Sequence, residues 1–244
     1  MQTFAAAVGL SVLGSVGGLL IASSFLALGD RIRLRIVPWA ISYAVGTLLG
    51  VALLALLPTA LDELPATRAL GTLLAGVLCF FILEKLVIWR HCHDDEHCKV
   101  HASSAASLVI VGDAFHTFVD GAVITAAVMT SVPLGITTAL AAAAHEIPQE
   151  LGDVAILLRA GYSRRRALTL NLVSAAGGVV GALCMIAAAQ AIPNALPYVL
   201  AFSAGAFLYV AMSDLIPDLH HDVGSGGARQ LLLIVAGIVT IMLL

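Results

Sequence analysis

The sequence predicts an all-α fold: a polytopic membrane bundle of eight transmembrane helices with both termini outside. Hydrophobic residues make up 60% of the 244 residues, charged residues make up only 11%, and the mean hydropathy is +1.03. Apolar runs of about 18 residues or more are typical of helices that cross a lipid bilayer. Eight such runs are present, at 4–28, 37–60, 67–89, 103–130, 134–159, 164–191, 194–219 and 228–244.

The first run is too long for a signal peptide, and no basic residue precedes it. Asp30 and Arg31 follow it in the manner of a helix end, so we interpret the run as a membrane span. The segments between the runs are too short to hold a soluble domain. Residues 1–244 therefore form a single transmembrane domain in this prediction.

Glycines spaced four residues apart occur in three of the runs. Without a Cβ atom, such pairs let helix backbones approach closely in a bilayer. They predict tight helix packing without identifying the partner helices, at Gly14/Gly18, Gly46/Gly50 and Gly177/Gly181.

Lysine and arginine residues predict the orientation, because cytoplasmic loops carry most of the positive charge of a membrane protein. Of the 12 Lys and Arg residues, all except Arg68 lie in or beside the first, third, fifth and seventh loops. We interpret that side as cytoplasmic and expect a multi-pass protein of the plasma membrane, or of a bacterial inner membrane. Since the basic residues serve as topology markers, we expect no nucleic-acid partner.

Two short polar motifs interrupt the fourth and fifth runs, each close to the midpoint of its run. They read His116-Thr117-Phe118-Val119-Asp120-Gly121 and His145-Glu146-Ile147-Pro148-Gln149-Glu150. An ionisable group at the centre of a bilayer costs about 2.5 kcal/mol or more, so such groups are rarely kept there without a function. We therefore expect the two motifs to form the functional centre of the bundle.

Residues four apart share one face of a helix, which aligns His116 with Asp120 and His145 with Gln149. The loop between the two runs is short enough to make them an antiparallel hairpin, so the two faces meet. The meeting faces bring two imidazoles, one carboxylate and one amide around a common point. An adjacent stripe of the second helix adds two further candidate ligands, Glu146 and Glu150.

Imidazole nitrogen and carboxylate oxygen are ligands suited to zinc and similar divalent transition metals. The sequence therefore predicts a membrane carrier, with zinc or a similar divalent cation as the transported substrate and no prosthetic group. Divalent metal ions and the lipid bilayer are the expected partners. Two other interpretations stay open, because a buried histidine can simply bond a backbone carbonyl, and chains of acids and histidines also serve as proton relays.

Further polar residues lie on the cytoplasmic side of the motifs and are candidate ligands along an exit path. Two of them lie one helical turn below the motifs, and the others lie near the end of the seventh run, where a solvated helix end would also explain them. The outer halves of the helices are almost wholly apolar, which predicts a closed hydrophobic gate above the site. The exit-path candidates are Asp113, Asp153, Asp214, Asp218, His220 and His221.

The third loop, at about 90–102, is unusually rich in metal-binding side chains. Its spacing matches no zinc finger, so we expect a flexible cytoplasmic metal-binding segment. A structural disulfide is not expected, because this loop faces a reducing compartment. The candidate ligands are His91, Cys92, His93, His97, Cys98 and His101.

These features resemble the ZIP (Zrt/Irt-like) metal-ion transporters, especially the branch with a histidine-rich third loop. The fourth-helix motif of that family, His-Asn-Phe-x-Asp-Gly, is similar to residues 116–121. The fifth-helix motif of the branch, His-Glu-(Leu/Ile)-Pro-His-Glu, is similar to residues 145–150. Residues 171–175 and 208–219 are also similar to this branch, and the resemblance covers the whole eight-span layout.

The resemblance implies a binuclear metal centre between the fourth and fifth helices, zinc as the commonest substrate, import toward the cytoplasm, and a homodimer. The first metal site would use His116, Asp120, His145 and Gln149. The second metal site would use Thr117, Asp120, Glu146, Gln149 and Asn171.

The chain departs from the family pattern at several of these positions. Thr117 replaces an asparagine, and Gln149 replaces a histidine or an acid. In the second helix, Val51 and Ala55 stand where the branch has an acid and a histidine. A neutral Gln149 removes a strong bridging ligand, so we expect one good site and one degraded site.

Two other classes of function compete with a metal carrier. An intramembrane zinc hydrolase would use His-Glu-x-x-His, but Gln149 occupies the second histidine position and Pro148 is expected to interrupt the helix just before it. A proton or cation exchanger needs acids at the midplane but not the loop rich in histidine and cysteine. We therefore expect a transporter and not an enzyme.

Overall fold

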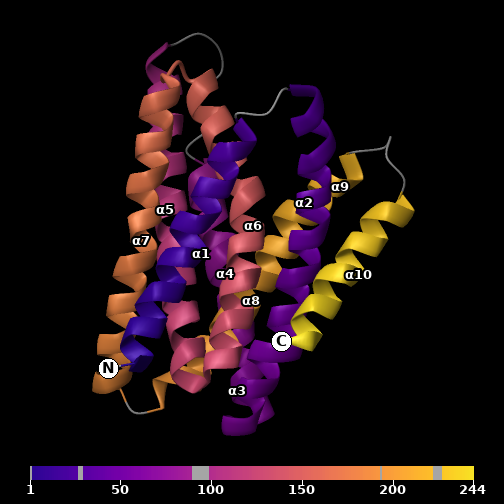
Figure 1. The fold of residues 1–244 in the computed structure, drawn as a ribbon. Coiled ribbons are helices and arrows are strands. Elements are labelled where there is room, and N and C mark those ends of the chain that lie inside the picture. The colour runs from indigo at the N-terminus through magenta and orange to yellow at the C-terminus, as the bar shows by residue number, and fades with distance from the viewer. Residues whose placement is uncertain (1, 27–29, 90–98, 193, 222–226) are drawn as a thin grey trace.

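Long helices run side by side along the molecule, and no strand occurs among the residues that the structure describes (Figure 1). This computed structural model describes residues 2–26, 30–89, 99–192, 194–221 and 227–244. Two π-helical segments, η1 (Val51–Leu56) and η2 (Val210–Leu215), continue α2 into α3 and α8 into α9. The α-helices are α1 (Gln2–Leu26), α2 (Asp30–Gly50), α3 (Leu57–Glu63), α4 (Ala66–Trp89), α5 (Lys99–Thr130), α6 (Val132–Arg159), α7 (Arg164–Ala191), α8 (Ala195–Tyr209), α9 (Ile216–His221) and α10 (Gly227–Leu243).

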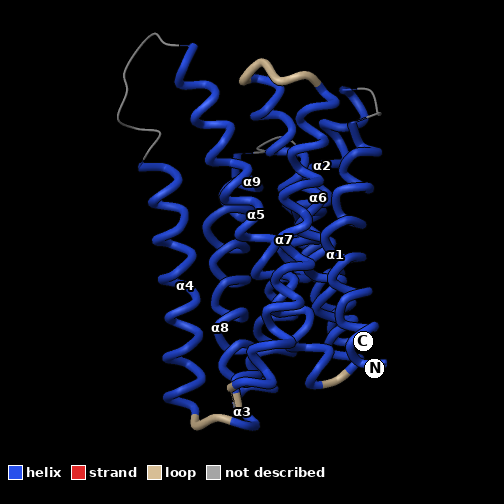
Figure 2. Tube along the Cα trace, turned by 90° about the vertical axis from the view of Figure 1, so that its left-hand side faces the viewer, coloured by secondary structure: helices blue, strands red, loops and turns tan. Residues whose placement is uncertain are grey.

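The helices form two groups that meet at the centre of the molecule. Helices α1, α5, α6 and α7 pack against one another, while α10 packs on α2 and α4 packs on α8. The groups join where α6 contacts α2 and where α5 contacts α8. Helix α4 lies at one edge of the bundle (Figure 2). Helices α5 and α6, which carry the two polar motifs, therefore lie between the other helices.

Five segments of the described chain are long and apolar enough to cross a membrane, which confirms the prediction of an all-helical membrane bundle. Two shorter apolar stretches belong to α1 and α10. Helix α6 is not among the five, because its polar residues lower its hydropathy. The five segments are Ile36–Glu63, Ala66–Lys85, Ile110–Thr130, Arg164–Ala191 and Ala195–Leu215.

The predicted second span at 37–60 agrees with the apolar segment Ile36–Glu63, although helix α2 itself begins earlier, at Asp30. Two other details of the predicted elements were wrong. Helix α5 begins at Lys99, so His101 lies in a helix and not in the loop. Helix α6 continues through Pro148, which was expected to interrupt it. A proline removes one backbone bond and can be tolerated where neighbouring helices hold the segment in place.

The glycine pairs lie at the closest helix contacts, and the structure identifies the partner helices. A Cβ atom added at Gly181 of α7 would meet the backbone of Phe118 of α5, and one added at Gly46 of α2 would meet the backbone of Ile234 of α10. A Cβ atom at Gly18 of α1 would lie 2.7 Å from the Cβ of Glu146. These glycines therefore let α7, α10 and α1 pack directly against the central helices.

The two π-helical segments share the sequence pattern Val-Ala-x-x-x-Leu-x-Pro, at 51–58 and 210–217. In each, the N–H of the residue before the proline donates to the carbonyl five residues earlier, from Leu57 to Ala52 and from Ile216 to Ala211. The proline has no N–H, and its ring clashes with the carbonyl four residues earlier, which disrupts the regular α-helical ladder. The predicted uniform helices at 37–60 and 194–219 therefore contain a π-turn each.

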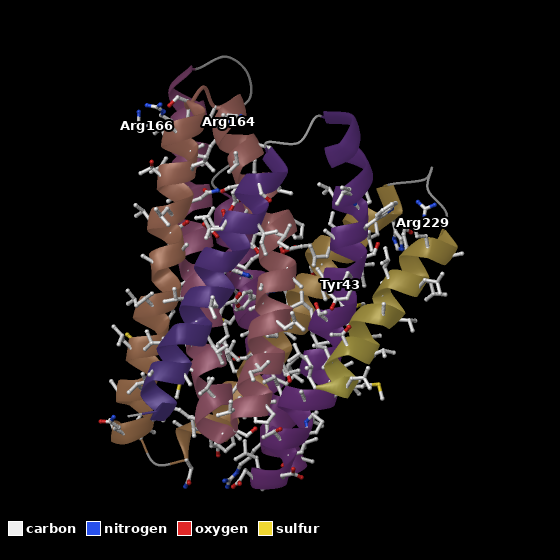
Figure 3. The ribbon with its side chains drawn as sticks, viewed as in Figure 1. Tyr43, Arg164, Arg166 and Arg229 are labelled. Carbon is white, nitrogen blue, oxygen red and sulfur yellow. The ribbon has the colours of Figure 1, made fainter. Side chains whose placement is uncertain are left out.

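Arg164, Arg166 and Arg229 all lie toward one end of the bundle, which we call the arginine end (Figure 3). Both chain termini lie toward the other end (Figure 1). The guanidinium of Arg229 stacks over the ring of Trp39, 5.2 Å from the ring centroid. Nearer the middle of the bundle, the hydroxyl of Tyr43 donates to Thr240 Oγ1 at 3.2 Å (Figure 3). These contacts hold α10 against α2.

Candidate metal site

Three ligand atoms converge in the interior of the bundle, two from α5 and one from α6. His145 Nε2 lies 2.9 Å from His116 Nε2 and 3.1 Å from Asp120 Oδ2. His116 Nε2 lies 3.8 Å from the same carboxylate oxygen. All three side chains are buried. Within the described part of the chain, they form the one group of three His, Cys, Asp or Glu residues whose ligand atoms lie within 4.8 Å of one another.

The spacing of these atoms suits a tetrahedral zinc ion. Ligand bonds of about 2.0–2.1 Å separate the ligand atoms of such an ion by about 3.3 Å. The three observed separations, 2.9, 3.1 and 3.8 Å, lie on both sides of that value. Small side-chain shifts would therefore bring His116, Asp120 and His145 to three corners of the tetrahedron, and a fourth ligand would come from water or a neighbouring side chain.

The orientation of His145 leaves one nitrogen available for a metal ion. His145 Nδ1 lies 3.0 Å from the carbonyl oxygen of Ala141, and because a carbonyl only accepts, this nitrogen carries the proton. A bound metal ion would then take the lone pair of Nε2, the nitrogen that lies 3.1 Å from Asp120 Oδ2. Aromatic rings cover both imidazoles: Phe80 packs on His116 and Phe207 on His145, each in an edge-on arrangement. A ring N–H that donates to a backbone carbonyl, as at His145, is typical of metal-binding histidines.

The turn between α5 and α6 sets the two motifs opposite each other. Ser131 has an extended backbone and caps α6, its hydroxyl accepting from the N–H of Leu134 at 3.3 Å. Pro133 in the first turn of α6 has the backbone φ that a helix start needs. With so short a connection the two helices run antiparallel, as the sequence predicted, and their midpoints lie side by side.

A group of buried carboxylates surrounds this centre. Glu146 is 2% exposed, Glu150 is 1% exposed and Asp113 is 4% exposed. Ser174 of α7 donates a hydrogen bond to Asp113 Oδ2. Ser174 was not among the predicted site residues, although it lies in the stretch 171–175, one helical turn after Asn171. The carboxylates close enough to act electrostatically on Glu146 are those of Asp120, Glu150, Asp113 and Asp153.

Three candidate metal ligands that the family resemblance suggested, Thr117, Asn171 and Gln149, lie in different surroundings. Thr117 is fully buried and its hydroxyl donates to the carbonyl of Asp113 at 2.8 Å. Asn171 is fully buried beside Glu150. Gln149 is half-buried and lines a cleft.

This cleft has a volume of about 760 Å³ and lies between α2, α6 and η2, in the half of the bundle toward the arginine end. Its polar lining includes Gln149, Asp153 and Asp214. Asp153 and Asp214 were predicted to lie on one path, and the structure places both in the lining of this cleft. The α2 residues Val37 and Pro38, which also line the cleft, were not predicted. An apolar stretch of sequence does not reveal which neighbouring helix its side chains contact.

On the other side of the centre, toward the turn between α5 and α6, the interior is filled mainly by apolar side chains, with the buried hydroxyls of Thr125 and Ser203 among them. Val123 and Ala127 of α5 and Leu200, Ala204 and Phe207 of α8 are all 1% exposed or less. The polar cleft and the apolar core therefore lie on opposite sides of the three ligand atoms.

The remaining predicted ligands lie at the edge of the described structure. His220 is exposed near the end of α9. The side chains of Asp218, His221 and His101 lie outside the described residues, and so do the loop candidates His91, Cys92, His93, His97 and Cys98.

A buried group of two histidines and an aspartate in an all-helical membrane bundle defines a membrane protein that handles divalent metal ions. The family model described as "ZIP Zinc transporter" matches residues 89–244 of this chain. Zinc transporter ZIP13 of Pongo abelii is 33% identical over 238 residues, which cover 89% of this chain and 71% of that protein. The chain belongs to the ZIP zinc transporter family, and the predicted resemblance is confirmed.

Other relatives match over different lengths. Zinc transporter ZIP13 of Homo sapiens is 29% identical over 275 residues, covering 89% of this chain and 74% of that protein. Zinc transporter ZIP10 of Homo sapiens is 38% identical over 146 residues, but the match covers only 56% of this chain and 18% of that protein. Membership of a transporter family confirms that the chain is a zinc transporter and not an enzyme, and it removes the zinc hydrolase interpretation.

Proposed function

We propose that this protein moves zinc across the membrane toward the cytoplasm through a site formed by His116, Asp120 and His145. The observation that carries this proposal is the convergence of two imidazole nitrogens and one carboxylate oxygen in the buried interior. Glu146 is buried next to this group and supplies a further oxygen ligand. Zinc is the transported substrate in this proposal.

The direction in which the zinc ion is released follows from the difference in polarity between the two sides of the site. Toward the arginine end, the cleft lined by Gln149, Asp153 and Asp214 offers an aqueous path. Toward the other end, residues such as Leu200 and Phe207 close the interior. An ion held at the site would leave through the cleft, with Asp113, Asp218, His220 and His221 as further ligands on the way.

For the topology, we propose eight spans, with α1, α6 and α10 added to the five apolar segments, and both termini outside. The arginines at one end of the bundle support this orientation under the positive-inside rule. We propose the plasma membrane, or a bacterial inner membrane, as the location. We also propose a homodimer, for which the family resemblance is the support.

For the second metal site of the family, we propose Thr117, Asp120, Glu146, Gln149 and Asn171 as a weakened version. Two features support weaker metal binding at this second site. The Thr117 hydroxyl is engaged with a backbone carbonyl, and the Gln149 amide is a neutral and therefore weaker ligand.

Uptake of radioactive zinc into proteoliposomes containing the purified protein tests this function. Zinc should accumulate above the level in protein-free vesicles, and unlabelled zinc should compete better than cadmium, iron, manganese or cobalt ions. A proton or cation exchanger would move protons or sodium without zinc, and absence of zinc uptake by correctly inserted protein would overturn the proposal.

Replacing Gln149 with histidine should change both kinetic constants of zinc uptake. An added imidazole beside the site strengthens zinc binding, which we expect to lower the half-saturation concentration by about tenfold. Tighter binding also slows release into the cleft, so the maximal rate should fall. Uptake measured against zinc concentration in both proteins checks this. If neither constant changes, Gln149 does not reach the transported ion.

Replacing residues 91–98 with a glycine–serine linker of equal length should leave the zinc transport rate unchanged. These residues precede α5 and lie outside the helices that hold the site. The number of zinc ions bound per protein should fall, because five candidate ligands are removed: His91, Cys92, His93, His97 and Cys98. Metal analysis and uptake on the same preparation measure both effects. Loss of transport by inserted protein would mean that the loop belongs to the conduction path.

A further inference from the structure

Helix α4 reaches the His/Asp site through the ring of Phe80. This helix lies at one edge of the bundle (Figure 2) and packs mainly on α8, with little contact to α5. Most of its surface is exposed, but Phe80 is only 8% exposed. The Phe80 ring meets the His116 imidazole edge-on, with 6.0 Å between the ring centroids. A helix that supplies none of the three ligand atoms therefore touches one of the three ligands.

His116 is the least firmly held of these ligands. It is 9% exposed, compared with 1% for both Asp120 and His145. The carbonyl oxygen of Ala141 orients the His145 ring, whereas among the described residues the His116 ring has no backbone partner of this kind. Packing must therefore set the position of the His116 imidazole, and Phe80 supplies that packing on the side toward α4.

Phe80 lies between two contacts that fix α4 on α8. Gly76, Phe80 and Glu84 are four residues apart, which places them on one face of the helix. A Cβ atom added at Gly76 would meet the carbonyl oxygen of Phe202 in α8, so the two backbones touch there. One turn after Phe80, Glu84 Oε2 accepts a hydrogen bond from the hydroxyl of Tyr209 in α8. The Phe80 ring is therefore anchored one turn before and one turn after its own position.

The position of His116 decides how wide the site can become. Zinc binds nitrogen and oxygen ligands at about 2.0–2.2 Å, and a larger ion of the same charge, such as cadmium, needs its ligand atoms further apart. The longest of the three ligand separations, 3.8 Å, joins His116 Nε2 to Asp120 Oδ2. Because protein interiors are closely packed, an imidazole with Phe80 against it cannot move further toward α4. The site therefore cannot widen on that side.

We propose that Phe80 is a specificity-determining residue of the zinc site. It blocks movement of His116 toward α4, which keeps the ligand atoms at a spacing that suits zinc and disfavours larger divalent ions such as cadmium. Phe80 acts through His116 and does not itself bind the ion, so it is a positioning residue. The inference rests on the proposed function in that His116 is a ligand of the transported ion.

Uptake of zinc and of cadmium by Phe80→Ala protein in proteoliposomes tests this. For each ion, the ratio of the maximal rate to the half-saturation concentration is measured, and the two ratios together give the preference for zinc over cadmium. The shorter side chain opens space beside His116, so this preference should fall by about tenfold, as when a group that supports a metal ligand is altered. General misfolding would lower uptake of both ions alike and leave the preference unchanged.

Phe80→Leu should keep most of the preference for zinc, because leucine still fills the space beside His116. Equal loss of preference in the leucine and alanine variants would overturn this steric role. The matched control is Leu78→Ala, which shortens a side chain of the same helix that is 51% exposed, and it should leave the preference unchanged.

Tyr209→Phe tests the anchoring of Phe80 without opening a cavity beside His116. Removing the hydroxyl that bonds Glu84 loosens α4, so the preference for zinc should fall by about threefold, in line with the loss of one hydrogen bond. This variant keeps the inference testable if Phe80→Ala does not insert into the membrane. In that case, an unchanged preference in Tyr209→Phe would count against the inference.

The outcomes separate this inference from the proposed function. An unchanged preference for zinc over cadmium in inserted, active Phe80→Ala protein would overturn the role of Phe80 and leave the zinc site standing. Zinc uptake that is unaffected by His116→Ala would instead overturn the proposed function.

Discussion

Replacing His145 with alanine is expected to lower zinc uptake at limiting zinc by about 100-fold or more, because loss of a direct ligand should cost at least as much as the loss of about 10–100-fold that follows removal of a ligand's supporting partners. Its Nε2 lies closest to both of the other ligand atoms, 2.9 Å from His116 Nε2 and 3.1 Å from Asp120 Oδ2. Its Nδ1 lies 3.0 Å from the carbonyl oxygen of Ala141, which holds the ring in this orientation. Asp120→Ala should cause a similar loss, because it removes the only charged ligand of the three.

Uptake into proteoliposomes, normalised to the amount of inserted protein, measures this effect. Removing His145 leaves the Asp120 carboxylate buried without its neighbour, which can destabilise the fold. His145→Gln is therefore the second variant, because it keeps a polar side chain of similar length. The control Asp62→Ala changes an exposed acid of α3 and should retain uptake. Near-normal uptake by folded His145→Ala protein would rule out the site.

Replacing Gly181 with leucine should destabilise the whole bundle by about 3 kcal/mol, at the upper end of the usual cost of overpacking. A Cβ atom at this position would meet the backbone carbonyl of Phe118 and not a movable side chain. Helix α7 would have to separate from α5, its most extensive partner. Because Phe118 lies between His116 and Asp120 on α5, zinc binding should weaken as well.

The matched control is Gly71→Leu in α4, where an added Cβ atom meets nothing within 4 Å. It makes the same chemical change in a transmembrane helix, and the difference between the variants isolates the helix contact. Unfolding of both proteins in the same detergent, followed by circular dichroism, measures the effect. Equal stability of the two variants would mean that the α5–α7 contact is not as close as described.

The sequence by itself determined the class of protein and most of the residues that meet at its centre. Apolar runs of membrane length can be recognised without knowing any contact, because each helix satisfies its own backbone hydrogen bonds in lipid. The spacing of His116 and Asp120 depends only on the geometry of one helix, and a short turn after Thr130 is enough to bring His145 opposite them. These features are local, so the pattern of residues predicts them.

The tertiary structure alone decided which residues meet across helices. The glycine pairs predicted close packing, but only the fold showed that Gly181 meets α5 and Gly18 meets Glu146. The same holds for Ser174, whose contact with Asp113 joins residues 61 positions apart. Asn171 and Glu150 could not be paired from sequence either. A one-dimensional pattern gives the face of each helix, whereas the rotation and neighbours of that helix depend on the packing of the entire bundle, which no local spacing encodes.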